Sequence, residues 1–349
     1  MKTDYSYQDK AANVVLQKAL SGKYAAAILG ACPSSGKTTI SHMIISNYIA
    51  LFPNSKVLVL TEGQNALKNQ YLEELANAHI KIDFTYGALD SDAQVRVGIP
   101  QSISKLDWMQ VDLLIVDESH RFFMAPMVQS IVKKLNPIHT ILMTGSPTQF
   151  NGKAQYAIHY ISAEELQAKG IFSGVRMDVV KTQNKNNAKA SIRDALLQAK
   201  KNKDNMSKIM VACPSIGYAN EVAWFMREHS YSIALSTSEN DKDDVQIKRF
   251  KSGEANVLIV VGKGVLGFND SNITLLIDMK SSNNLDNSQQ LFSRVLRKHP
   301  KNVVKTYYRI SDKDYNNQVL MLHKMIGLMQ TKIFKGFTGK NLKLEMIST

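Results

Sequence analysis

The fold class follows from the segment Tyr24-Ala-Ala-Ala-Ile-Leu-Gly-Ala-Cys-Pro-Ser-Ser-Gly-Lys-Thr38 and the residues that come directly after it. Residues 24–30 form a short apolar run, which is typical of a buried strand. The next residues are rich in Gly, Ser and Pro, which favour a turn, and residues 37–51 have helical spacing. The order strand, turn, helix predicts one unit of a parallel α/β sheet.

Short apolar runs of the same kind recur along the chain. They lie at residues 57–61, 111–116, 140–144, 176–180, 208–212, 232–235, 256–261, 274–277 and 304–308. Because strands that are apolar throughout are buried on both faces, we predict parallel sheets covered by helices on each side. The runs fall into two sets, so we expect two α/β domains, at residues 1–172 and 173–335, followed by a tail at 336–349.

Length and charge agree with this division and suggest a class of partner. At roughly 150 residues per domain, 349 residues fit about two domains. The formal net charge is +13, and lysine or arginine placed on a phosphate releases condensed counterions. A nucleic acid is therefore a reasonable partner, although many basic proteins bind none.

The sequence also bears on location and redox state. No apolar run approaches the about 20 residues of a membrane span, and residues 1–10 lack a signal-peptide core. We therefore expect a soluble cytoplasmic protein with no membrane partner. The two cysteines, Cys32 and Cys213, are too few for a disulfide framework or a four-thiolate zinc site, whereas a single bridge stays possible.

We interpret two helical segments as structural elements, one with a solvated face and the other packed on a domain core. Residues 190–199 have helical spacing between lysine- and asparagine-rich flanks, and a solvated face explains them better than a nucleic-acid site. Ser311 and Asp314 resemble a helix N-terminal cap. Apolar residues from Leu322 to Ile333 then follow at helical spacing, which predicts a helix packed on the second domain.

The turn after the first strand has the composition of a phosphate-binding loop. Backbone N–H groups of the turn and of the helix N-terminus would surround phosphates, Lys37 would reach the β- and γ-phosphates of ATP, and Thr38 would bind Mg²⁺. Ala31 replaces the usual first glycine, so the loop is a variant, and a chance Gly-Lys-Thr is the alternative. The residues expected to line the nucleotide are Ala31, Pro33, Ser34, Ser35, Gly36, Lys37, Thr38 and Thr39.

An acidic pair supplies the chemistry that such a loop requires. Asp117-Glu118-Ser-His120 follows the apolar run at 111–116, so Asp117 would meet the phosphate site at the carboxyl edge of a parallel sheet. Asp117 is then placed to hold hydrated Mg²⁺, and Glu118 to orient and deprotonate a water molecule. A helix cap with a solvated neighbour is the alternative.

Together these segments resemble the superfamily 2 helicases, since Asp-Glu-Ser-His is similar to their Asp-Glu-x-His box. The resemblance covers residues 5–310 and implies two tandem RecA-like domains with an ATP cleft between them. Other segments match in order. In the first domain, Gln8 matches the glutamine that reads adenine, and residues 57–70 match motif Ia. Residues 100–105 match a segment that contacts nucleic acid, and Thr61, Gln101 and Ser102 are the expected contacts. Thr144-Gly-Ser146-Pro matches motif III, which couples the ATP and nucleic-acid sites.

The second domain carries the remaining motifs of this resemblance. Residues 247–261 resemble the approach to motif V, and Gly267-Phe-Asn269 its turn. Gln290-Leu-Phe-Ser-Arg294-Val-Leu-Arg297 is similar to motif VI, with Ser293 in place of a glycine. Ser236 and Lys263 are expected to contact nucleic acid. Arg294 and Arg297 are expected on one face of a helix, where guanidinium groups would offset charge at the γ-phosphate.

The resemblance implies an ATP- and Mg²⁺-dependent motor that acts on nucleic acid. Residues 161–171 and the Thr-Gly-Ser-Pro step look more like phage branch-migration helicases, DNA-repair helicases and restriction-enzyme motor subunits than like RNA helicases. We therefore expect a DNA-stimulated ATPase with unwinding, annealing or translocation as its output, in a bacterial or phage-infected cell, with a protein partner for strand separation. An RNA helicase and a non-catalytic binding adaptor are the alternatives.

Overall fold

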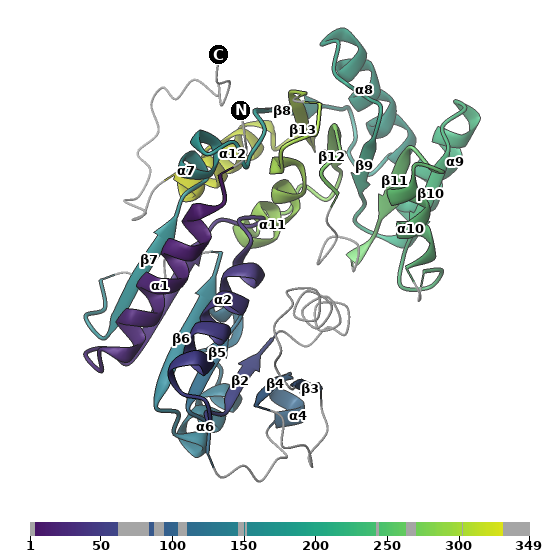
Figure 1. Cartoon of the computed structure of the whole chain (residues 1–349). Helices are drawn as coiled ribbons and strands as arrows, with labels where there is room; N and C mark the ends of the chain where they lie inside the picture. The colour runs from purple at the N-terminus through teal and green to yellow at the C-terminus, as the bar shows by residue number, and fades with distance from the viewer. Residues whose placement is uncertain are drawn as a thin grey trace. The chain divides into compact units, whose positions relative to one another are not determined.

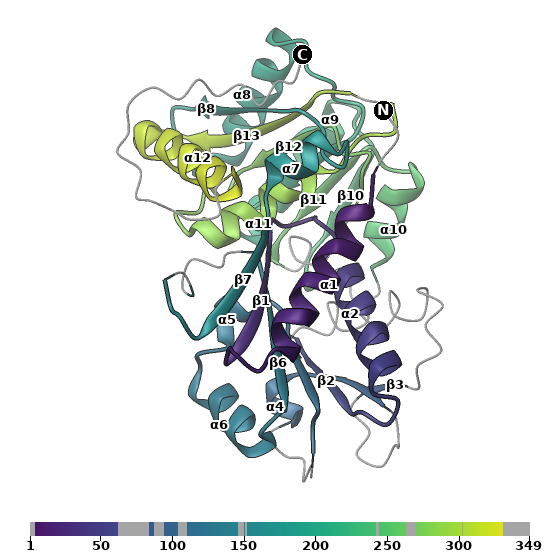
Figure 2. The same ribbon diagram turned by 60° about the vertical axis from the view of Figure 1, so that its left-hand side comes forward.

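The computed structural model describes residues 4–61, 84–86, 94–103, 110–145, 150, 152–241, 244–262, 270–301 and 303–330. Within these ranges the chain forms two compact units, which divide between Glu165 and Leu166. Figures 1 and 2 show the elements of each unit. The division lies before the boundary predicted after residue 172. The segment that follows Leu166 is hydrogen-bonded to the second unit, with Ser173 N donating to Leu296 O and Lys298 N to Ile171 O.

The first unit is built on one sheet of seven strands in the order β3-β4-β2-β5-β6-β1-β7, and all of its pairs are parallel. The strands are β1 (Ala26–Ala31), β2 (Val57–Leu60), β3 (Phe84–Tyr86), β4 (Val95–Gly98), β5 (Leu113–Val116), β6 (His139–Thr144) and β7 (Tyr156–Ile161). The helices are α1 (Ser6–Leu20), α2 (Lys37–Leu51), α4 (Pro100–Ile103), α5 (Ser119–Phe122), α6 (Pro126–Leu135) and α7 (Ala163–Ala168), of which α7 spans the division between the units.

The core of this unit lies on the faces of its central strands. All six residues of β1 are buried, and Ile28 pairs with Leu142 of β6 and Ile158 of β7. One face of the sheet packs against Val128 and Ile131 of α6. β1 lies between β6 and the edge strand β7, both parallel to it, and α2 begins after the carboxyl end of β1.

The second unit repeats this plan with six strands in the order β10-β11-β9-β12-β13-β8, again all parallel. The strands are β8 (Val175–Lys181), β9 (Ile209–Ala212), β10 (Ile233–Ser236), β11 (Val257–Val260), β12 (Leu275–Asp278) and β13 (Lys305–Ser311). The helices are α8 (Ala188–Lys201), α9 (Ile216–Glu228), α10 (Val245–Ser252), α11 (Leu285–Leu296) and α12 (Tyr315–Gln330).

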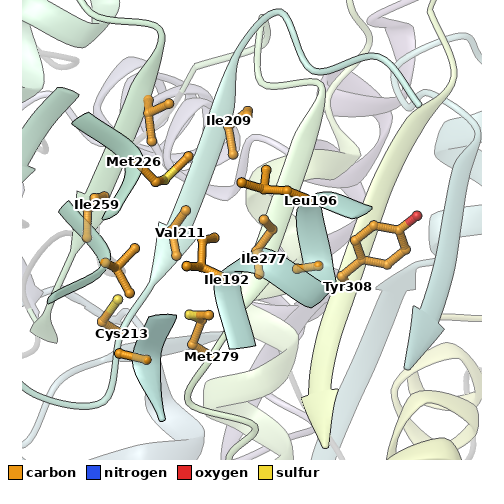
Figure 3. Packing of buried hydrophobic residues seen from close by; sticks show 14 of the residues in the cluster. Ile192, Leu196, Ile209, Val211, Cys213, Met226, Ile259, Ile277, Met279 and Tyr308 are labelled. Carbon is orange, nitrogen blue, oxygen red and sulfur yellow. The ribbon is translucent and has the colours of Figure 1, made fainter. Parts of the chain in front are cut away.

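The two faces of the second sheet are covered by different helices. On one face, Ile192 of α8 and Met226 of α9 pack with Val211 and Tyr308 in the cluster that Figure 3 shows. Tyr307, the neighbour of Tyr308 along β13, points to the other face. There its ring meets Phe292 of α11 edge-on, with 5.2 Å between the ring centroids.

The predicted fold class is confirmed, with two α/β units in succession. The predicted helix at 37–51 has the bounds of α2, and the strand expected from Tyr24 begins at Ala26. Strands β3, β4 and β7 were not predicted. At the start of the last helix, Ser311 Oγ donates to Asp314 Oδ1 (2.7 Å), and Asp314 O accepts from Gln318 N (3.1 Å) as the first backbone bond of the helix, while Ile333 lies outside the described residues.

Both cysteines are free and buried, one in each unit. The single bridge that the sequence left possible is therefore not formed. Burial raises the pKa of the Cys32 thiol to about 12. Among the described residues, no helix has the length and apolar character needed to span a membrane.

Candidate active site

The segment between β1 and α2 has the backbone shape of a phosphate-binding loop. Ser34 (φ 67°) and Gly36 (φ 82°) both adopt the left-handed conformation, which turns the chain sharply into the first residue of α2, Lys37. Cys32 N donates to Ile161 O of β7 (3.2 Å), and Ser35 N donates to Cys32 O (3.2 Å). The loop is therefore fixed to the neighbouring strand at one end and to itself at the other.

Gly36 is required chiefly by its conformation. A Cβ atom at this position would lie 2.5 Å from Gln8 Nε2, the end of a flexible side chain, which would have to shift. A side chain at φ 82° would also be strained. The glycine predicted from the Gly-Lys-Thr pattern therefore lets α1 pack directly on the loop.

Helix α1 holds the loop through Tyr7, a residue to which the sequence assigned no role. Its hydroxyl donates to the backbone oxygen of Ser35 (2.6 Å), and Gln8 Nε2 donates to the same hydroxyl (3.3 Å). Tyr7 is 3% and Gln8 7% exposed. Gln8 thus lies beside the loop, where its amide nitrogen contacts Tyr7, and its role as adenine reader stays a prediction.

The predicted catalytic pair lies beside the start of α2. Lys37 Nζ is 3.4 Å from Glu118 Oε1, and the two side chains are 11% and 21% exposed. Burial alone would lower the pKa of Lys37, but the Glu118 and Asp117 carboxylates offset this and raise it. Burial alone would raise the pKa of Glu118, but Lys37, His120 and Arg121 lower it. Both groups are therefore charged at neutral pH.

Asp117 and Glu118 leave β5 in a tight turn. Asp117 N donates to Leu60 O of β2 (2.9 Å), and Glu118 N donates to the Asp117 carboxylate (2.9 Å). Glu118 has a left-handed backbone (φ 45°), which directs the chain into α5. The turn brings the Glu118 carboxylate to Lys37 at the carboxyl edge of the sheet, where parallel α/β sheets bind ligands.

His120 links this turn to β6. Its Nδ1 atom is 2.9 Å from Thr144 Oγ1 and 3.5 Å from Glu118 Oε2. Thr144 is fully buried at the end of β6. The residue predicted to couple the ATP and nucleic-acid sites is therefore one side chain away from Glu118, whereas Ser146, its predicted companion, lies outside the described residues.

The polar side chains at the carboxyl edge of the first sheet fit a nucleotide with Mg²⁺. The Ser35 hydroxyl is buried and has no hydrogen-bond partner among the described residues, and buried polar groups rarely stay unpaired. Those residues contain no cluster of three or more His, Cys, Asp or Glu suited to a metal ion. Mg²⁺ is commonly held by one or two carboxylates together with substrate phosphates, so Asp117 and the Thr38 hydroxyl would be enough as protein ligands.

The motif VI candidates lie in and just after α11. The Asn284 side chain caps this helix by accepting from Asn287 N (2.9 Å). Gln290 and Arg294 are helical, and Ser293 Oγ donates to Gln290 O (2.6 Å), so serine replaces the usual glycine within a regular helix.

The prediction that Arg294 and Arg297 share one helical face is wrong. The helix ends at Leu296, and Arg297 has an extended backbone (φ −59°, ψ 139°). Arg297 instead forms an antiparallel bridge with Phe172, since Ser173 N donates to Leu296 O (2.8 Å) and Lys298 N to Ile171 O (3.0 Å). Pairing with this distant segment ends the helix.

The predicted nucleic-acid contacts are placed only in part. Thr61 is buried directly after β2, and Ser236 is buried as the last residue of β10. Gln101 is exposed on α4, the helix that also contains Ser102. The remaining candidates in the second unit, Lys263, Gly267 and Asn269, lie outside the described residues, as do residues 62–70 of the predicted motif Ia.

Comparison with protein families assigns each unit separately. Residues 2–149 match the model of the type III restriction enzyme res subunit. Residues 188–299 match the model of the helicase conserved C-terminal domain. No curated protein sequence matches the chain.

Solved structures share the fold at low sequence identity. S. cerevisiae Dbp5 bound to RNA and ADP BeF3 is 14% identical, with a TM-score of 0.62 over 90% of this chain and 88% of that one. A variant of Dbp5 in the same bound state is 12% identical, with a TM-score of 0.64 over 91% and 88%. A fragment of a putative HsdR subunit of a type I restriction enzyme from Vibrio vulnificus YJ016 is 16% identical, with a TM-score of 0.66 over 90% and 68%. The matched models, in this order on two parallel α/β units, show that the chain belongs to the superfamily 2 helicases.

Proposed function

We propose that the chain is a DNA-stimulated ATPase that uses ATP hydrolysis to unwind, anneal or branch-migrate DNA. The observation that carries the proposal is the ion pair of Lys37 and Glu118, 3.4 Å apart at the carboxyl edge of the first sheet. This pair joins the phosphate-binding loop to a carboxylate that is ionised at neutral pH. An adaptor that only binds nucleic acid has no need of such a pair.

In the proposed site, the loop and α2 bind the phosphates of ATP. Backbone N–H groups of the loop and the N-terminus of α2 favour negative charge, and Lys37 reaches toward the β- and γ-phosphates. The buried Ser35 hydroxyl gains a hydrogen-bond acceptor there. Thr38 and Asp117 would hold Mg²⁺, which would neutralise charge on the phosphates.

Glu118 is the proposed general base. Its lowered pKa keeps it as a carboxylate, ready to accept a proton from the attacking water. His120 Nδ1 lies 3.5 Å from the second carboxylate oxygen and 2.9 Å from Thr144 Oγ1. A change at Thr144 would therefore reach the base through one imidazole ring, which is a route for coupling hydrolysis to nucleic acid.

The proposal also gives residues of the second unit roles in the reaction. By resemblance to motifs V and VI, Gly267, Asn269 and Gln290 would contact the nucleotide. Arg294 and Arg297 would supply guanidinium groups to the γ-phosphate in the transition state. A base on one unit and arginines on the other make hydrolysis depend on both.

DNA is favoured over RNA by the match of residues 2–149 to a restriction enzyme subunit. The likeness to Dbp5, whose structures contain RNA, supports the RNA helicase as the second candidate. Contacts at Thr61, Gln101, Ser102, Ser236 and Lys263 would be mostly to phosphates, so binding would depend little on sequence. We further propose repair or recombination DNA of a bacterial or phage-infected cytoplasm as the substrate, and a partner protein for strand separation.

ATPase activity tests the proposal directly. Phosphate release is measured without nucleic acid and with single-stranded, duplex, forked and four-way DNA and RNA, with Lys37→Ala as the inactive control. We expect the greatest stimulation from DNA. Stimulation by RNA alone would favour the RNA helicase, and the absence of phosphate release with every nucleic acid would favour the adaptor.

A further inference from the structure

A buried ion pair lies at the carboxyl edge of the second sheet. Asp278 is the last residue of β12, and Arg309 lies beside it on β13. Their side chains are 1% and 0% exposed, and Arg309 Nη1 is 3.4 Å from Asp278 Oδ2. No role in the proposed reaction has been given to either residue.

The Asp278 carboxylate is held on both oxygen atoms. Oδ1 accepts from the backbone N–H groups of Lys280 and Ser281, both at 3.0 Å. Oδ2 accepts from the Tyr307 hydroxyl at 2.8 Å. The carboxylate therefore fixes the first residues of the loop that follows β12.

The Arg309 guanidinium fixes the next residues of the same loop. Its Nη2 atom donates to Ser282 O (2.8 Å), and its Nε and Nη2 atoms donate to Gln318 Oε1 of α12 (3.0 and 2.7 Å). Gln318 Nε2 in turn donates to Asn283 Oδ1 (3.2 Å) and to Asp314 Oδ2 (2.7 Å). Arg309 and Gln318 thus tie the loop to β13 and α12.

The loop held in this way leads directly into α11. Ser288 Oγ, in the first turn of α11, donates to Ser282 O (2.9 Å), the same oxygen that Arg309 contacts. Asn284, two residues after Ser282, caps the helix. A buried ion pair stabilises a fold no better than apolar packing does, but its donors and acceptors must keep one geometry. Its distinctive contribution here is therefore to the position of α11.

We propose that Asp278, Tyr307, Arg309 and Gln318, here called the buried network, are positioning residues that set the start of α11 and thereby place Arg294 for ATP hydrolysis. None of them needs to touch ATP. The inference rests on the proposed function, because Arg294 acts in hydrolysis only there.

The next residue along β13 offers a matched control. The Tyr308 hydroxyl donates to the buried carboxylate of Asp204 and accepts from Asn202 Nδ2 (2.9 Å), and Arg176 pairs with Asp204. Tyr307 and Tyr308 are both fully buried and both donate to a carboxylate. Asp204 lies between α8 and β9, at the amino end of the strands, so its cluster holds β8 and β13 rather than the approach to α11.

The test compares Tyr307→Phe with Tyr308→Phe in the full chain. Each variant keeps its ring and loses one hydroxyl on a buried carboxylate, so both should melt slightly below the wild type. The kcat and KM for ATP are measured at saturating nucleic acid, and hydrogen–deuterium exchange is followed at the amides of α11. Since small misplacements slow chemistry more than binding, we expect Tyr307→Phe to lower kcat roughly 10-fold with little change in KM.

Tyr307→Phe should also speed exchange in the first turns of α11, while Tyr308→Phe leaves kcat and this exchange at the wild-type values. Gln318→Met, which perturbs the buried network from α12, should repeat the effect of Tyr307→Phe in weaker form. Equal effects of the two tyrosine variants, or a wild-type kcat in Tyr307→Phe, would overturn the inference. Full turnover by Arg294→Ala would instead refute the role of the arginine in the proposed function, and α11 exchange would still test the buried network.

Discussion

Replacing Glu118 with Gln should trap ATP on the protein. In the structure Lys37 is paired with Glu118, so phosphates that bind Lys37 must compete with this carboxylate. At 3.4 Å, two unit charges attract by about 5 kcal/mol at an effective dielectric constant near 20 and by about 1 kcal/mol at that of water. Desolvation of the two groups opposes this attraction, so we take a net value of about 1 to 2 kcal/mol.

Removal of the carboxylate should therefore release Lys37 for the phosphates. Since about 1.4 kcal/mol corresponds to tenfold, Glu118→Gln should bind ATP on the order of 10-fold more tightly than the wild type. Turnover should fall roughly 100-fold or more, because a positioned general base typically contributes about that much. Tighter binding with slower chemistry distinguishes this role from loss of folding.

The assay is calorimetric titration of Mg²⁺-ATP beside phosphate release. Glu164→Gln is the matched control, because Glu164 is an exposed carboxylate at the start of α7 and its loss changes the net charge equally. Near-normal hydrolysis by Glu118→Gln would remove the residue from the role of base. Weaker ATP binding than in the wild type would show that the Lys37 pair does not compete with phosphate.

Four further outcomes are expected. Arg294→Ala and Arg297→Ala should each lower kcat on the order of 100-fold, or about 3 kcal/mol of transition-state stabilisation, and change ATP affinity far less. Steady-state ATPase activity is measured, with thermal melting as the folding control. Full turnover in both variants would contradict the proposed role of the arginines. Tyr7→Phe removes the hydroxyl that donates to Ser35 O, so it should lower the free energy of unfolding by about 1 to 2 kcal/mol and raise the KM for ATP. Thermal melting and steady-state kinetics measure the two effects, and an unchanged KM would contradict a role of this contact in ATP binding. Because the pKa of Glu118 is lowered, its pair with Lys37 contributes stability above the ordinary glutamate pKa of about 4.3, and this contribution is lost as pH falls further. The difference in free energy of unfolding between wild type and Glu118→Gln should therefore be constant from pH 6 to 8 and disappear in acid. A loss of this difference near pH 6 would contradict the lowered pKa. Nucleic-acid affinity should fall steeply with salt and vary little with base order, and a flat salt titration would count against phosphate contacts.

The parts of the fold and site that could be predicted from the sequence depend on local pattern. The apolar run of β1, the turn rich in Gly and Ser and the helix from Lys37 are contiguous, and so are β5 and Asp117-Glu118. Two such segments meet because parallel strands open at the same edge of a sheet. The placement of Lys37 and Glu118 at one edge of the sheet thus followed from two short motifs, whereas their ion pair was not predicted.

The features that were missed depend on residues far apart in the chain. Helical spacing placed Arg297 on α11, but pairing with Phe172 ends that helix at Leu296. The hydroxyl of Tyr7 meets Ser35, 28 positions away, and neither residue is unusual by itself. Strands β4 and β7 contain polar residues such as Arg96 and His159, which interrupt the apolar pattern by which the central strands were found.

The burial of both native thiols makes the chain suitable for site-specific fluorescent labelling. Cys32 and Cys213 are inaccessible, and burial raises the pKa of both thiols, so maleimide reagents should leave them unmodified in the folded protein. Single cysteines introduced at exposed positions, such as Ser130 on α6 and Asn220 on α9, would accept a donor and an acceptor dye without prior removal of the native residues. Energy transfer between the dyes would then report the distance between the two units through each cycle of hydrolysis.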